Sequence, residues 1–209
     1  MDRHPAFVKG TGMKETEDRE QQAERTAPSL RPPQQPRVPG RPVPAWFERK
    51  FAFTFPVEQY PNLCVRLLGA PVRLEELLHS ASASALTAKP EGKWSAQEHA
   101  GHLPDMEPLW LARVEDFLSG SGTLTVADLA NRKTHEAGHN DHPPAEILAA
   151  FRAARLRLLD RVEALDPARF SASLLHPRLQ QPMRLVDHLY FIAEHDDHHL
   201  AHIFELIRP

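Results

Sequence analysis

The chain has 209 residues, of which 25 are lysine or arginine and 28 are aspartate or glutamate, for a formal net charge of −3. Because both signs are interspersed, this composition excludes a broad basic surface, and we expect no nucleic-acid partner. A single cysteine excludes an internal disulfide framework, and no run approaches the roughly 18 consecutive apolar residues of a membrane span. With no secretory signal pattern either, we expect a cytoplasmic protein without a membrane partner, built as one ordinary domain plus a tail.

The tail is expected over residues 1–45. It is charged and polar up to Arg25, and seven prolines follow between Pro28 and Pro44. Such a segment cannot bury enough apolar surface to offset the entropy of ordering it, so we expect it to be disordered, with extended polyproline character. It would serve as a linker or as a docking ligand for a partner. The globular domain is expected over residues 46–209.

Two helical stretches open this domain. The first is expected over roughly residues 57–80, with a break near Pro71. The second begins at Ser95, where the Ser95 hydroxyl and the Glu98 carboxylate can form a capping box, and it ends at Gly120.

Two more helices complete the pattern. The third is expected after Pro144 and ends at Asp166, and the fourth is expected to begin at Pro182 and to run to Ile207. Strand-like alternation is almost absent, so the sequence predicts an all-α four-helix bundle. The link over residues 120–142 is longer than the usual connection between antiparallel neighbours, which predicts a crossover and a third helix parallel to the second.

The last helix carries a pair of candidate metal ligands. His195 and His199 are one turn apart on the same face, separated by a rise of about 6 Å. His188 lies two turns earlier and is too distant, while His198 points about 100° away. We expect His202 to orient a ligand histidine or to pack in the core. The alternative is that each histidine is a core residue whose nitrogen atoms are hydrogen-bonded.

A third ligand must come from another helix, and His102 is the best candidate. Its depth in the second helix matches that of His199 in the fourth if the two helices are antiparallel. His99 is the competitor. Three histidines without a fourth protein ligand are typical of an open site for a divalent metal such as zinc or nickel. Asp105 or Asp187 would orient the ligands.

A second motif offers a competing site. His135, Glu136 and His139 satisfy the H-E-x-x-H pattern of zinc hydrolases, in which the glutamate is the general base. The polar surroundings and the glycine within the motif argue against the buried helix that this pattern needs. We therefore expect the segment to cover the mouth of the bundle, with Asn131, His139 and Asn140 as candidate pocket-lining residues.

Three segments of the chain resemble the DinB-like family, named for DNA-damage-inducible proteins. The resemblance covers roughly residues 47–209 and rests on Lys93-Trp94-Ser95, Gly101-His102-Leu103 and the run from Glu194 to Leu200. It implies a four-helix bundle in up-down-down-up order and a divalent metal held at the positions of His102, His195 and His199. Some members are thiol-dependent S-transferases or isomerases that use bacillithiol or mycothiol, and many have no assigned reaction. The family name does not imply polymerase activity.

One departure concerns the second helix. Pro104 lies inside it, two residues after the candidate ligand His102, and Pro108 follows one turn later. Proline removes a backbone hydrogen bond and is expected to kink the helix. The kink either aims His102 at the metal or damages the site, and we favour the first.

The leading hypothesis is a metal-dependent enzyme that activates a low-molecular-weight thiol or water against a small electrophilic substrate. The first alternative is a non-catalytic metal-binding bundle that acts in a stress response by associating with another protein chain. The partner considered is a second copy of this chain, which would make a homodimer. The second alternative is the zinc hydrolase at His135, Glu136 and His139. A cavity that reaches the histidines would favour an enzyme over a structural role.

Overall fold

The computed structural model describes residues 1, 42–90 and 92–208. All that follows concerns the compact unit of residues 41–209. The predicted tail over residues 1–45 lies almost entirely outside the described residues, and residues 42–45 have no regular secondary structure.

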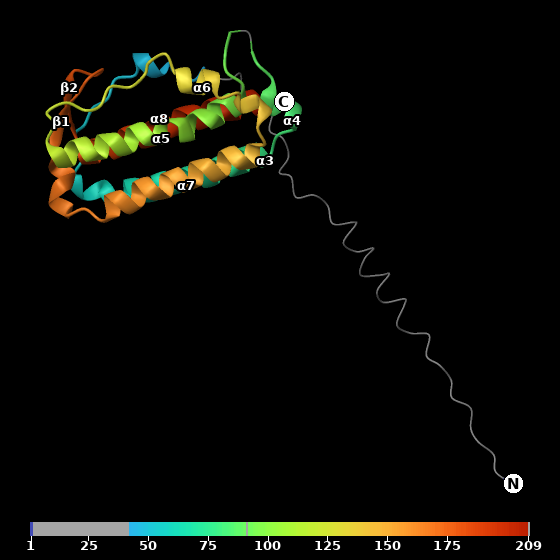
Figure 1. Cartoon of the computed structure of the whole chain (residues 1–209), viewed down its shortest axis with the longest axis horizontal. Coiled ribbons are helices and arrows are strands. Elements are labelled where there is room, and N and C mark those ends of the chain that lie inside the picture. The colour runs from blue at the N-terminus through green and yellow to red at the C-terminus, as the bar shows by residue number, and fades with distance from the viewer. Residues whose placement is uncertain (2–41, 91, 209) are drawn as a thin grey trace. The chain divides into compact units, whose positions relative to one another are not determined.

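The unit is a four-helix bundle, as the sequence predicts. Its long helices are α2 (Tyr60–Leu68) with α3 (Ala70–His79), then α5 (Ala96–Ser119), α7 (Pro144–Glu163) and α8 (Leu185–Ile207). The shorter elements are α4 (Ala83–Thr87), α6 (Arg132–Glu136) and 3-10 helices at Trp46–Glu48, Val57–Gln59, His139–Asp141 and Pro167–Ser171. In Figure 1, α5 and α7 run in one direction, while α3 and α8 run in the other. The up-down-down-up order and the long crossover between α5 and α7 are therefore confirmed.

Helix α5 begins where the local chemistry predicts. The Ser95 hydroxyl accepts a hydrogen bond from the Glu98 backbone N–H at 3.0 Å, and the Glu98 carboxylate accepts one from the Ser95 N–H at 2.8 Å. The helix ends at Gly120, whose φ of 69° suits glycine. Pro104 and Pro108 lie inside the helix without ending it. The idea that Pro104 aims His102 at the metal stays a prediction.

The predicted start of the last helix is wrong. Pro182 belongs to a β-hairpin formed by β1 (Ser173–His176) and β2 (Gln181–Arg184), and α8 begins only at Leu185. Among the described residues β2 pairs only with β1, so a proline without an N–H is tolerated in this edge strand. Asp187 then caps the helix, because its carboxylate accepts the Arg184 backbone N–H at 2.8 Å. Asp187 is thus occupied at the start of α8 and does not orient the candidate ligands, which corrects that expectation.

A buried ionic layer crosses the core. Arg155 of α7 donates to Asp196 of α8 at 2.6 Å and to Glu107 of α5 at 2.5 Å, and all three residues are at most 3% exposed. On each helix, apolar core residues lie on both sides of this layer, with Phe151 and Leu158 flanking Arg155. The layer therefore fixes the relative heights of three helices. Among the described residues, no helix is long and apolar enough to span a bilayer.

Candidate metal centre

Three histidines converge between α5 and α8. His102, His195 and His199 are 3%, 4% and 6% exposed, and one ring nitrogen of each lies within 4.8 Å of those of the other two. The Nε2 atoms of His195 and His199 are 3.2 Å apart. The structure thus brings together the three residues that spacing and depth single out.

The donor set fits a divalent cation. Two nitrogen ligands at about 2.0–2.1 Å from a tetrahedral zinc ion lie about 3.3 Å from each other, close to the separation of the two Nε2 atoms in α8. Burial lowers the pKa of His102 to about 4 and lowers those of His195 and His199 well below the ordinary value. The three imidazoles are therefore neutral at pH 7 and have lone pairs available for a metal.

His102 is oriented by a hydrogen-bond relay. The Thr134 hydroxyl donates to the Asp105 carboxylate at 2.9 Å. The hydroxyl oxygen of Thr134 is then free to accept a hydrogen bond from Nδ1 of His102, also at 2.9 Å. The proton of His102 is thereby placed on Nδ1, and Nε2 carries the lone pair. Asp105 thus orients His102, as predicted, but does so through Thr134.

The α8 histidines are oriented differently. Nδ1 of His199 lies 2.9 Å from Nδ1 of His99, and the His99 ring stacks on His202 with centroids 4.8 Å apart. His99 is therefore a partner of His199 and lies outside the three-histidine cluster. His195 has no partner for its Nδ1 among the described residues, and the Trp46 ring packs edge-on against it at 5.1 Å.

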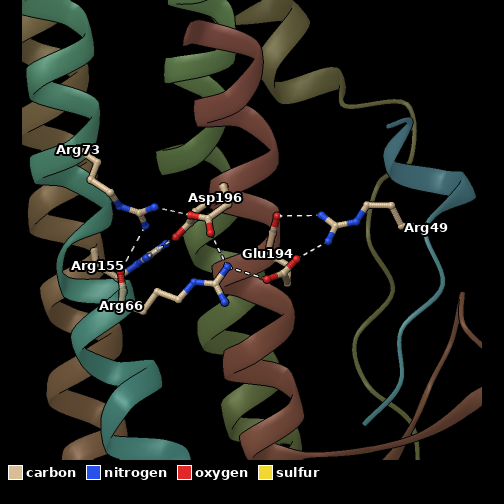
Figure 2. A network of polar contacts seen from close by, with 7 residues as sticks. Arg49, Arg66, Arg73, Arg155, Glu194 and Asp196 are labelled. Atoms are coloured by element: carbon tan, nitrogen blue, oxygen red, sulfur yellow. Dashed lines mark hydrogen bonds and ion pairs between the residues drawn. The ribbon is translucent and has the colours of Figure 1, made fainter. Parts of the chain in front are cut away.

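Three acidic residues in the middle of α8 are held by arginines from other segments. Figure 2 shows Glu194 and Asp196 with the arginines that contact them. The pairs are Glu194 with Arg49 and Arg66, Asp197 with Arg66 and Arg73, and Asp196 with Arg155. These carboxylates are therefore neutralised, and the candidate centre keeps an all-histidine donor set.

A cavity of about 420 Å³ reaches all three histidines. Its wall includes Trp46, Trp94 and Trp110, which are all the tryptophans of the chain. A volume of this size and an apolar wall suit a small organic molecule. The histidines thus lie in the wall of a cavity, which is the arrangement that favours an enzyme over a purely structural site.

The crossover lines this cavity with residues 126–129 and Asn131 rather than with all three predicted residues. Asn131 lines it, but His139 and Asn140 do not. His139 instead contacts the Asp105 carboxylate through Nε2 at 2.8 Å, and Asn140 accepts from the Ser95 hydroxyl at 2.7 Å. These two residues hold the crossover against α5 rather than lining the pocket.

The H-E-x-x-H segment does not form a hydrolase site. Helix α6 ends at Glu136, and Gly138 then adopts a φ of 62°, so His135 and His139 do not share one helix. His135 and Glu136 are exposed, whereas His139 is buried. Among the described residues, the three-histidine cluster is the group placed to hold a metal, and this motif does not contribute to it.

Several cavity residues escaped the sequence analysis. Arg113, His176 and Arg178 line the end of the cavity formed by α5 and the β-hairpin. Arg113 could have been noticed, because it follows Trp110 by one turn on the buried face of α5. The two hairpin residues carry no recognisable spacing.

Gly101 leaves room for the His139 ring, which contacts the Asp105 carboxylate. A Cβ at this position would overlap the His139 ring. We expect Gly101→Ala to lower the free energy of unfolding by about 1–3 kcal/mol, because a packed ring must move. Gly69→Ala is the matched control, since its Cβ would lie an ordinary 3.5 Å from the Val65 carbonyl oxygen. Urea unfolding of both variants checks this, and equal stabilities would contradict the expectation.

Comparison with known proteins gives a family and a fold. The sequence profile of the DinB superfamily matches residues 66–203. One similar solved structure is described as "YfiT from Bacillus subtilis is a probable metal-dependent hydrolase with an unusual four-helix bundle topology". It is 22% identical, with a TM-score of 0.65, over 76% of this chain and 91% of that chain, a likeness that shows the fold alone. A search of curated proteins finds no match.

Proposed function

This chain belongs to the DinB superfamily, and on that premise we propose that it is a metal-dependent enzyme acting on a small molecule. His102, His195 and His199 would hold the divalent cation, with zinc or nickel favoured. The observation that carries the proposal is that three neutral imidazoles meet in the wall of a 420 Å³ cavity, with no fourth ligand among the described residues. Such a site has an open position for water or substrate.

A bound divalent cation would supply a Lewis acid that lowers the pKa of a thiol or water at the open position. The protein's own residues provide the rest. Thr134 and Asp105 hold the His102 ring in one tautomer, and His99 holds the His199 ring. The three tryptophans give the cavity an apolar wall beside these histidines, against which the apolar part of a substrate can pack.

For the reaction, we favour transfer of a low-molecular-weight thiol to an electrophilic carbon of the substrate. A carbon–sulfur bond would form, the leaving group would depart with its electron pair, and the thiol proton would pass to solvent. Hydrolysis at the same site is the second candidate, suggested by the description of the Bacillus subtilis protein with this fold. Location in the cytoplasm and assembly as a homodimer stay predictions.

The test is turnover by the zinc- or nickel-loaded protein, with bacillithiol, mycothiol or another small thiol and a panel of electrophiles. We expect metal-dependent thiol consumption that His102→Ala abolishes and that exposed His79→Ala leaves unchanged. Product formed equally well without thiol would favour hydrolysis. Absence of metal-dependent turnover of any electrophile, with or without thiol, would contradict an enzymatic role.

A further inference from the structure

A second group of polar residues lies at the hairpin end of the cavity. Arg113 comes from α5, while His176 and Arg178 come from the end of β1 and the turn that follows it. Arg113 is 2% exposed, and its Nε donates to the Thr125 carbonyl at 2.9 Å. All three residues line the same cavity as the candidate metal ligands.

Neither guanidinium forms an ion pair with a described residue. Among the described residues, no carboxylate oxygen lies within 4.0 Å of a nitrogen of Arg113 or Arg178, unlike the arginines that clamp α8. Nη2 of Arg178 is buried and has no acceptor. The cavity does contain Asp128, but its carboxylate accepts from Arg132 and from the Ala130 N–H. The Asp116 charge acts on Arg113, but this carboxylate accepts the Thr125 N–H and forms no ion pair with the guanidinium. Two positive charges, on buried Arg113 and half-buried Arg178, therefore face one cavity without a direct ion-pair partner, a position that an anionic ligand would fill.

The tautomer of His176 adds a third donor. Its Nδ1 accepts the backbone N–H groups of Arg178 and Leu179 at 3.2 and 3.1 Å, so the proton of the neutral ring is on Nε2. Burial, together with the charges of Arg113 and Arg178, lowers the pKa of His176 to about 3, so the ring is neutral at pH 7. Its Nε2–H faces Nη1 of Arg113 at 3.3 Å, and a guanidinium can only donate. The Arg113 guanidinium and the His176 Nε2–H are therefore both hydrogen-bond donors, and each needs an acceptor that the other cannot provide.

We propose that Arg113, His176 and Arg178 form a subsite for an oxyanion, a carboxylate or phosphate carried by a small organic molecule. Oxygen atoms with several lone pairs can accept from all three donors at once, and guanidinium groups match such anions well. The Trp110 ring, 5.5 Å from the Arg113 guanidinium carbon, offers an apolar surface for the rest of the ligand. As an assignment of substrate class, this inference rests on the proposed function, but anion binding itself does not require the metal.

The test uses the full-length protein freed of metal by chelation. Phenylacetate, phenyl phosphate and neutral phenylacetamide are titrated while tryptophan fluorescence is followed, since every tryptophan lines the cavity. We expect at least one anion to bind about tenfold or more tightly than the amide, and the comparison of the two anions identifies the favoured group. Failure of both anions to bind, or equal affinity for the amide, would overturn the inference.

Variants assign the binding to these residues. Arg178→Met is expected to weaken anion binding about tenfold or more, and Arg113→Lys keeps the charge but not the forked geometry, so it should weaken binding less. The matched control is Arg169→Met, which removes one exposed positive charge elsewhere. Equal anion affinity in Arg178→Met and Arg169→Met, with both folded by circular dichroism, would overturn the assignment.

A zinc titration of the same samples separates the two proposals. Anion binding without zinc binding would keep the subsite and contradict the proposed metal-dependent function. Zinc binding without anion binding would keep the proposed metal site and overturn the anion subsite.

Discussion

Arg155→Met is expected to lower the free energy of unfolding by about 3–5 kcal/mol, one of the two largest effects that the structure predicts. The substitution removes the cation between two buried carboxylates, those of Glu107 and Asp196. Burial already raises the pKa of Glu107 to about 7 and raises that of Asp196, in spite of the arginine. Without Arg155, each carboxylate must either stay charged without a partner or take up a proton.

The control for this prediction lies on the same helix. Arg161 pairs with Glu115 at the surface, and Arg161→Met should cost at most about 1 kcal/mol. Both variants are compared by urea unfolding at pH 7. Similar losses in the two variants would show that the buried layer contributes no more than a surface ion pair.

The second large effect concerns metal affinity. We expect His199→Ala to weaken zinc binding by more than about 100-fold, because it removes one of three ligands, whereas loss of an orienting partner costs about 10–100-fold. Thr134→Val is the intermediate case, since it keeps all three histidines but removes the hydroxyl that fixes His102. Zinc titration with a competing chelator gives the affinities.

Exposed His79 on α3 provides the matched control, and His79→Ala should bind zinc like the wild type. The expected order of affinity is wild type and His79→Ala, then Thr134→Val, then His199→Ala. A His199→Ala protein that binds zinc as tightly as the control would exclude this residue from the site.

The parts of the fold that follow from local chemistry could be predicted. The start of α5 is set by two residues three positions apart, Ser95 and Glu98, whose contacts the helix itself dictates. The pairing of His195 with His199 depends only on helical periodicity. The prediction of His102 as third ligand needed one further assumption, that α5 and α8 pack antiparallel. The fold confirms this assumption (Figure 1).

The β-hairpin could not be predicted because its strands have four residues each, too few to show alternation. Pro182 also imitates the first turn of a helix, and this signal misplaced the start of α8. The missed hairpin carries three cavity residues, His176, Pro177 and Arg178. Because the hairpin was missed, its contribution to the cavity wall was absent from the prediction.

Contacts between residues far apart in the sequence could not be predicted either. Arg155 meets Glu107 and Asp196 across 48 and 41 positions of sequence, and no local pattern marks such a layer. The Thr134 relay likewise depends on how the crossover folds back over α5. The sequence identified the candidate ligands and Asp105, whereas the residues that contact the ligand rings directly, Thr134 and His99, were assigned to this role only from the packed structure.

The most direct test of the central claim is the X-ray absorption spectrum of the zinc-loaded protein. A zinc ion on His102, His195 and His199 predicts three imidazole nitrogens at about 2.0–2.1 Å, with a further light atom at the open position. Cys64 should be absent from the coordination sphere, because it does not belong to the group of residues whose ligand atoms meet at this site. A sulfur ligand at about 2.3 Å, or fewer than three imidazoles, would contradict the three-histidine centre.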